Sequence, residues 1–185
     1  MPLLRTDRLS RFVLGVPLAG AVLLLSNCQG DVAVRPPEKE RPAYLADSLG
    51  AFVRMNQSDA SRYFVSGIHD LEAGNWRWTG RQAALRFQLS QTKNLKYVMR
   101  FAVPEPVIAR NGPIRLRILI NGKKLEELQY QKHGVYEFEK PTPAEMLKPD
   151  AENIVTMEID KPLPSDGRGP ELGFILVHAG FRRSQ

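Results

Sequence analysis

The sequence predicts an all-β protein, an antiparallel β-sandwich of the jelly-roll type with about eight strands and one short N-terminal helix. Three observations predict it. From Tyr63 onward, apolar and polar residues alternate with a period of two. Clusters of Gly, Pro and Asn separate the alternating runs, as tight turns require. The gaps between the runs are too short for the crossover helices that a parallel sheet needs.

The N-terminal segment has the layout of a secretory signal peptide. Three arginines lie between positions 5 and 11, and an apolar run extends from Phe12 to Leu25. As a helix this run would span roughly 21 Å, which is shorter than the ~30 Å hydrocarbon core of a membrane. Pro17 also interrupts it. A cleaved signal peptide therefore fits the segment better than a membrane-spanning anchor.

The cleavage region Leu25-Ser26-Asn27-Cys28 resembles the lipobox of bacterial lipoproteins. This resemblance implies that Cys28 becomes the acylated, palmitate-bearing first residue of the mature protein. Asn27 stands where such sequences usually carry Gly, Ala or Ser, and a plain secretory signal is the alternative. Gln29 rather than Asp follows the cysteine, which by resemblance to enterobacterial sorting implies the outer membrane, facing the periplasm. Cys28 is the only cysteine, so acylation leaves no free thiol in the oxidising envelope.

The next segment links this anchor to the folded part. Residues 28–43 are polar and contain several prolines, which predicts a flexible tether. Four apolar residues then recur at helical spacing and predict one short amphipathic helix. They are Leu45, Leu49, Phe52 and Val53. The predicted organisation is a signal peptide over 1–27, the tether over 28–43, a short helix and connector over 44–60, and the sandwich over 61–185.

The alternating runs predict half-buried strands with apolar residues inward and charged residues outward. The last run, 173–181, is apolar on both sides, which predicts a central strand. Asn121-Gly122, between two runs, is a strong signal for a β-hairpin turn. The other runs lie over residues 85–89, 95–103, 114–120, 124–130, 136–139 and 155–159.

Short motifs between Gly67 and Phe181 resemble a known kind of bacterial β-sandwich. They are Gly67-Ile68-His69-Asp70-Leu71-Glu72, Arg77-Trp78-Thr79, Ile120-Asn121-Gly122, Asp166-Gly167-Arg168 and Leu172-Gly173. The chain resembles the carbohydrate-binding-like domains found beside bacterial glycosyltransferases and methyltransferases, and alone in lipoproteins. Gly169-Pro170 make its closing turn longer than the family pattern. The resemblance implies an architecture like that of carbohydrate-binding modules.

The two tryptophans are the first candidate ligand-binding residues. Trp76 and Trp78 are two positions apart, so in a strand they share one face. Such a pair can form a platform that stacks on sugar rings. The alternative is that both pack in or beside the core, as large aromatic residues commonly do. We expect Trp78 to be the more buried, which leaves Trp76 as the candidate for sugar stacking.

A second candidate group lies just before this pair. His69, Asp70 and Glu72 could bind a metal, or the two carboxylates could act as an acid/base pair. Three neighbouring polar residues are equally typical of an ordinary loop. His133 and His178 are isolated and are expected to be core or surface residues. The sequence contains no Gly-x-Ser-x-Gly motif and no phosphate-binding loop before a helix. We therefore expect no catalytic residues, no metal and no cofactor.

Five basic residues occupy outward positions on three successive predicted strands. If these strands shared one sheet, its outer face would be basic and could bind lipopolysaccharide phosphates, acidic glycans or phospholipid headgroups. If the strands instead alternate between sheets, the cations would pair with Glu126, Glu137, Glu139 or Glu158. The five are Arg86, Lys96, Arg100, Arg115 and Arg117. The complete set of candidate ligand-binding residues is Trp76, Trp78, His69, Glu72, Arg86, Arg100, Arg115 and Arg117.

Composition and motifs together favour a binding protein. The formal net charge is a modest +6, and no nucleic-acid-binding motif is present. The expected function is that of a non-catalytic, lipid-anchored envelope protein with a carbohydrate-binding-like module. Its partners would be the membrane, through the lipid anchor, and an envelope polysaccharide. The main alternative is an assembly lipoprotein that docks onto an export or secretion complex. A small hydrolase using the His69–Glu72 region is the third.

Overall fold

The computed structural model describes residues 49–165, 167 and 169–184. The predicted signal peptide, Cys28 and the tether lie outside these residues. Among the residues described, no helix is both long and apolar enough to cross a lipid bilayer.

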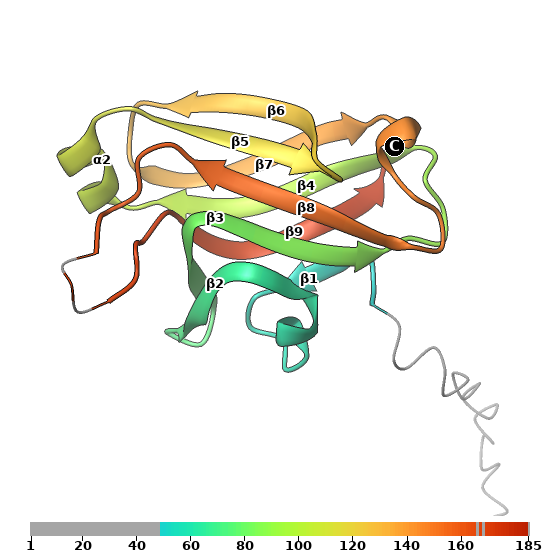
Figure 1. Ribbon diagram of the computed structural model, residues 1–185, viewed down its shortest axis with the longest axis horizontal. Helices are drawn as coiled ribbons and strands as arrows, with labels where there is room; N and C mark the ends of the chain where they lie inside the picture. Colours follow the sequence, from blue (N-terminus) through green and yellow to red (C-terminus); the bar gives the residue numbers. More distant parts are fainter. Residues whose placement is uncertain (1–48, 166, 168, 185) are drawn as a thin grey trace, which may run out of the picture. The chain divides into compact units, whose positions relative to one another are not determined.

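Nine strands and three short helical segments make up the folded part (Figure 1). The helical segments are the 3-10 turns η1 (Ala60–Tyr63) and η2 (Ala144–Met146) and the α-helix α2 (Glu105–Asn111). The strands are β1 (Phe52–Arg54), β2 (Phe64–Glu72), β3 (Trp76–Gln88), β4 (Leu95–Val103), β5 (Ile114–Ile120), β6 (Lys123–Tyr130), β7 (Gly134–Thr142), β8 (Glu152–Ile159) and β9 (Ile175–Arg183).

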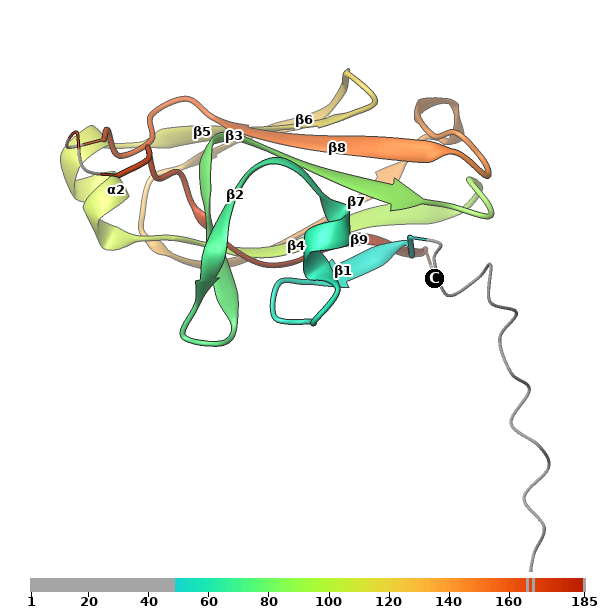
Figure 2. The same cartoon turned by 60° about the horizontal axis from the view of Figure 1, so that its bottom comes forward.

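All strand pairs are antiparallel, and the order is β6-β5-β8-β3-β9-β4-β7, with β1 added to β9 and β2 to β3. Strand β3 joins two layers: its residues from Gln82 to Gln88 pair with β8, whereas Arg77 and Trp78 pair with β9. The sheet therefore folds over itself, with β6-β5-β8-β3 in one layer and β1-β9-β4-β7 in the other (Figure 2). Along the chain, β3, β4 and β5 alternate between the two layers. Strand β6 stays in the layer of β5, and β7, β8 and β9 alternate again. The predicted antiparallel jelly-roll sandwich is confirmed.

Aromatic side chains fill the space between the layers. Phe181 on β9 contacts Phe87 and Tyr97, with ring centroids 5.6 and 5.5 Å apart, and Phe101 meets Phe174 at 5.7 Å. Phe87, Tyr97, Phe101 and Phe174 are completely buried. Fully burying a large apolar side chain contributes about 1.5–3 kcal/mol, so this cluster supplies much of the free energy that holds the layers together.

The alternating runs predicted most strands, and the last run is indeed central, because β9 lies between β3 and β4. The Asn121-Gly122 turn is confirmed as well. Both residues have positive φ, +50° and +80°, as a tight hairpin between β5 and β6 requires. The Asn121 side chain also donates to the carbonyl of Met146 and accepts from the Ile154 N–H. The turn is thereby fixed to η2 and to β8, the strand that pairs with β5.

The helix predicted from Leu45 to Val53 is wrong over its described part. Phe52–Arg54 form β1, which pairs with β9. Val53 is buried in the core, while Arg54 is exposed. A strand of three residues is too short to show a period of two. An α-helix occurs instead at α2, which starts after Pro104 and ends at Asn111, just before Gly112, whose φ is +68°.

Candidate functional site

The motifs that carry the family resemblance hold β2, β3 and the start of β9 together. The Thr79 hydroxyl, completely buried, donates to the carbonyl of Phe174 at 2.9 Å and accepts from its N–H at 3.0 Å. The Gly173 N–H donates to the Thr79 carbonyl at 2.6 Å. A Cβ at Gly67 would lie 1.8 Å from the carbonyl oxygen of Gln82. These motif residues are therefore structural, while Asp166 and Arg168 lie outside the described residues.

His69, Asp70 and Glu72 do not form a common site. The His69 ring nitrogen Nε2 lies 3.3 Å from the carbonyl oxygen of Glu171, and the carboxylates of Asp70 and Glu72 are exposed. Within the described residues, no three His, Cys, Asp or Glu side chains are arranged to hold a metal ion. His133 is exposed and lies just before β7. The structure thus gives this region the geometry of an ordinary hairpin.

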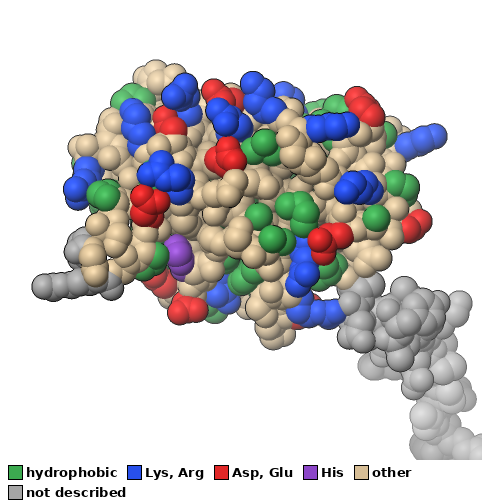
Figure 3. All heavy atoms as spheres, viewed as in Figure 1, with side chains coloured by type: hydrophobic (Ala, Val, Ile, Leu, Met, Phe, Trp, Pro, Cys, Tyr) green, Lys and Arg blue, Asp and Glu red, His purple; other side chains and the backbone are tan. Residues whose placement is uncertain are grey.

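Of the two arrangements considered for the five basic residues, the structure shows the one in which they fall in different layers and pair with acidic side chains. Arg86, Arg115 and Arg117 lie on β3 and β5, whereas Lys96 and Arg100 lie on β4. All five form ion pairs. These are Arg86–Glu152, Lys96–Glu139, Arg100–Glu137, Arg115–Asp160 and Arg117 with both Glu127 and Glu158. Figure 3 accordingly shows a face on which acidic and basic side chains are interspersed.

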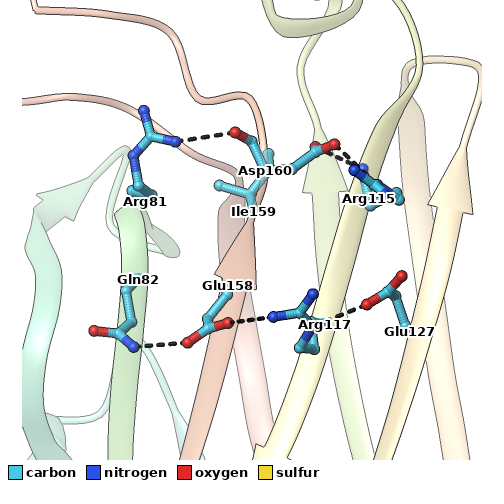
Figure 4. Close-up of a pocket in the computed structure, with 8 residues that line it drawn as sticks. All are labelled: Arg81, Gln82, Arg115, Arg117, Glu127, Glu158, Ile159 and Asp160. Atoms are coloured by element: carbon cyan, nitrogen blue, oxygen red, sulfur yellow. Dashed lines mark hydrogen bonds and ion pairs between the residues drawn. The ribbon is translucent and has the colours of Figure 1, made fainter.

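One hollow of about 310 Å³ lies over β3, β8, β5 and β6 (Figure 4). Across it, the Gln82 amide donates to Glu158, and Arg117 donates to Glu158 at 3.4 Å and to Glu127 at 2.9 Å. The bond from Arg117 holds the pKa of the Glu127 carboxyl below its usual value. A second row is formed by Arg81 and Arg115, which donate to the carbonyl and the carboxylate of Asp160. The charges that line this hollow satisfy one another.

A second hollow, of about 500 Å³, lies on the outer face of β1, β9 and β4 and is bounded by the β2–β3 turn; we call it the Trp76 groove. Its apolar floor consists of Ala102, Ile175, Val177 and Val135, and Val135 is 62% exposed. Its other lining residues are Arg54, Asn56, Asn75, Trp76, Arg100 and His178.

The β2–β3 turn positions the aromatic end of the groove. The Asn75 N–H donates to the carbonyl of Glu72, and the positive φ of Ala73 and Gly74 reverses the chain. Trp76 is half-buried and meets Trp78 edge to face, with ring centroids 6.3 Å apart. Trp78 packs against the core. One tryptophan therefore supports the other, and Trp76 lines the groove.

His178 occupies the middle of the groove. Its ring contacts that of Phe52, with centroids 5.1 Å apart. Burial lowers the pKa of the His178 imidazole below its usual value, and Arg182, Arg100 and Arg54 add to this effect while Glu137 opposes it. This environment favours the neutral form of the His178 imidazole.

Of the sequence candidates, the structure places only Trp76 and Arg100 in the groove. Arg54, Asn56 and His178 were not candidates. Arg54 and Asn56 fall in a segment predicted as a helix and connector, so their position beside β9 could not be read from the sequence. The apolar run around His178 did predict its central strand, but not which strands would lie next to it.

The comparisons with known proteins identify structural neighbours and no family. No protein-family model matches the chain, and no curated protein matches it significantly in sequence. Among solved structures, a family 35 carbohydrate-binding module from an environmental isolate is similar over 65% of this chain and 90% of its own, with 14% identity and a TM-score of 0.36.

Two further neighbours are a second family 35 module and a glucuronidase. The family 35 module from Cellvibrio japonicus matches over 72% of this chain and 96% of its own, with 11% identity and a TM-score of 0.36. The chain spans only 14% of the 4-O-methyl-α-glucuronidase BtGH115A, with 13% identity and a TM-score of 0.39. These neighbours include carbohydrate-binding modules with a β-sandwich fold, and the likeness by itself assigns no function.

Proposed function

We propose that this chain is a non-catalytic, lipid-anchored envelope protein that binds a saccharide in the Trp76 groove. The observation that carries the proposal is the composition of the groove. An indole ring at one end, an apolar floor and several polar side chains line one open hollow. Its volume of about 500 Å³ is within the ~300–1,000 Å³ typical of small-ligand sites.

Each part of the groove has a counterpart in the chemistry of a sugar ring. The apolar face of a pyranose stacks on an aromatic ring, and Trp76 offers that surface while Trp78 holds it in place. Hydroxyl groups need donors and acceptors, and Asn56, Asn75 and Arg54 line the groove with exposed side chains. The amide of Asn56 has no hydrogen-bond partner among the described residues and is available to a ligand.

The hollow of Figure 4 is a weaker candidate for the same role. Its lining contains no aromatic residue, and its arginine and glutamate side chains already bond to one another. A ligand there would have to displace existing ion pairs before it could form hydrogen bonds of its own. Charge pairing therefore favours the Trp76 groove.

The lipid anchor belongs to the proposal because Cys28 lies outside the described residues. An acylated Cys28 followed by a polar tether would display the groove at the membrane surface. Mass spectrometry of the mature protein tests this part. We expect acylated Cys28 at its N-terminus, and an unmodified cysteine would require the anchor to be withdrawn.

Saccharide binding is tested with a glycan array and two variants of one residue. We expect Trp76→Ala to weaken binding at least about tenfold, the equivalent of ~1.4 kcal/mol. Trp76→Phe should retain most of the affinity, because it keeps an aromatic face. Val65→Ala, which shortens an exposed apolar side chain on β2 outside the groove, is the control. Absence of binding to any glycan, or full binding by Trp76→Ala, would overturn the proposal.

A protein partner is the alternative, and Val135 is the observation that favours it. This side chain is 62% exposed on β7, which is the last strand of its layer. Exposed apolar residues on an edge strand are typical of surfaces to which another protein docks. A stoichiometric partner that is lost on Val135→Asp but retained on Trp76→Ala would favour an assembly lipoprotein.

A further inference from the structure

The register of three neighbouring strands places a row of basic side chains across the Trp76 groove. Arg54 on β1 is directly opposite His178 on β9, and His178 is directly opposite Arg100 on β4. Side chains paired in this way lie roughly 5 Å apart at their Cβ atoms. All three line the groove. We call them the basic row.

The basic row carries more positive charge than the nearby acid neutralises. Arg100 pairs with Glu137 on β7, with Nη1 and Oε1 3.3 Å apart, and both side chains are well exposed. Arg54 has no acidic partner in the part of the chain that the structure describes. Arg182 lies over the ring of Phe52, 4.6 Å from its centroid, and it also has no acidic partner there. One carboxylate thus faces three guanidinium groups.

The hollow on the opposite layer lacks this excess. Arg81, Arg115 and Arg117 each reach a carboxylate there. Like charges placed on adjacent strands weaken a sheet. An arrangement that opposes stability locally is typical of a functional site, where a ligand offsets the cost.

We propose that the saccharide bound in the Trp76 groove carries an anionic group, a carboxylate or a phosphate, that binds to Arg54, His178 and Arg100. This inference rests on the proposed function and specifies its ligand. The planar guanidinium group matches both anions by donating two parallel hydrogen bonds. With the anion on the basic row, the rest of the sugar lies over the apolar floor towards Trp76.

Such binding depends on pH through His178. The charged groups that face it are Arg54 on β1, Arg182 on β9, Arg100 on β4 and Glu137 on β7. The arginines disfavour the protonated imidazole, whereas a bound anion favours it. Binding of a uronate therefore takes up a proton, and affinity for it rises as the pH falls below 7.

The test uses the full chain in a non-ionic detergent and a panel of immobilised oligosaccharides of matched length: uronate-containing, phosphorylated and neutral. We expect at least tenfold tighter binding to anionic members than to their neutral counterparts. Arg54→Gln should remove most of this preference, and His178→Gln should remove the pH dependence of binding to the uronate-containing members, whose carboxylate stays ionised near neutral pH. Arg110→Gln, which makes the same charge change on α2, should bind like the unmodified chain. The uronate and phosphate members distinguish the two anions.

The possible failures are distinguishable. Equal, Trp76-dependent binding of neutral and anionic members would overturn the anionic ligand and leave saccharide binding intact. If no member of the panel binds, both proposals are overturned. A preference for anionic members that persists unchanged in Arg54→Gln would show that the anion binds elsewhere, which also overturns this inference.

Discussion

At the scale of single residues, buried polar groups decide how well the two layers are joined. Thr79 is completely buried, and its hydroxyl bonds to both backbone polar groups of Phe174. The Phe174 carbonyl has a second donor, the Thr79 N–H. The Phe174 N–H, in contrast, bonds to the Thr79 hydroxyl. A buried N–H without a partner is costly.

Replacement of Thr79 by valine, which has nearly the same shape, tests this junction. Thr79→Val leaves the Phe174 N–H unsatisfied, and we expect the free energy of unfolding to fall by about 1–3 kcal/mol. Thr79→Ser keeps the hydroxyl and should cost less. Urea denaturation of both variants measures the difference. Equal stability of Thr79→Val and the unmodified chain would contradict this role.

At the scale of elements, the position of β1 decides whether the groove exists. Strand β1 pairs with β9 over three residues and brings Arg54 beside His178. The close approach requires Gly180, because a Cβ there would lie 2.4 Å from the carbonyl oxygen of Ala51 and 2.5 Å from the Cα of Phe52. Its φ is +149°. Both observations exclude a larger residue at this position.

Gly180→Ala is therefore expected to displace β1 from β9. The free energy of unfolding should fall by roughly 1–3 kcal/mol, as for other overpacked sites. Ligand binding should be lost as well, since Arg54 moves with β1. Gly112→Ala is the matched control, because Gly112 also has a positive φ, +68°, but a Cβ there would meet no atom within 4 Å. Loss of binding in the control as well would refute the explanation.

Strand β1 also shows which parts of the fold could not be predicted from the sequence. Strands such as β4 and β5 are long enough for the period of two to be read from the residues alone. In β1 only Val53 is buried between two outward residues, and the apolar spacing around it imitates a helix. The order of strands depends on pairings distant in the chain. The alternating runs alone therefore group Arg100 with Arg115 and Arg117 as outward basic residues, although the latter two lie in the other layer.

At the scale of the whole molecule, the two outer faces of the sandwich differ in charge pairing. On β3, β8, β5 and β6, the arginines that line the hollow of Figure 4 are neutralised by neighbouring acids. On β1, β9 and β4, the groove contains Trp76, an apolar floor and Arg54, which has no acidic partner among the residues that the structure describes. The sandwich thus has one face whose hollow is lined by paired charges and one face that carries the groove proposed to bind a saccharide.

An NMR titration shows directly which face binds. The isotopically labelled chain is titrated with an oligosaccharide that it binds, and the chemical shifts of its backbone and indole N–H groups are followed. We predict that the shifts concentrate on Arg54, Asn75, Trp76, Arg100 and His178, with the Trp76 indole among the largest. Shifts concentrated on Arg81, Arg115 and Arg117 would place the ligand on the opposite face and contradict the proposed site.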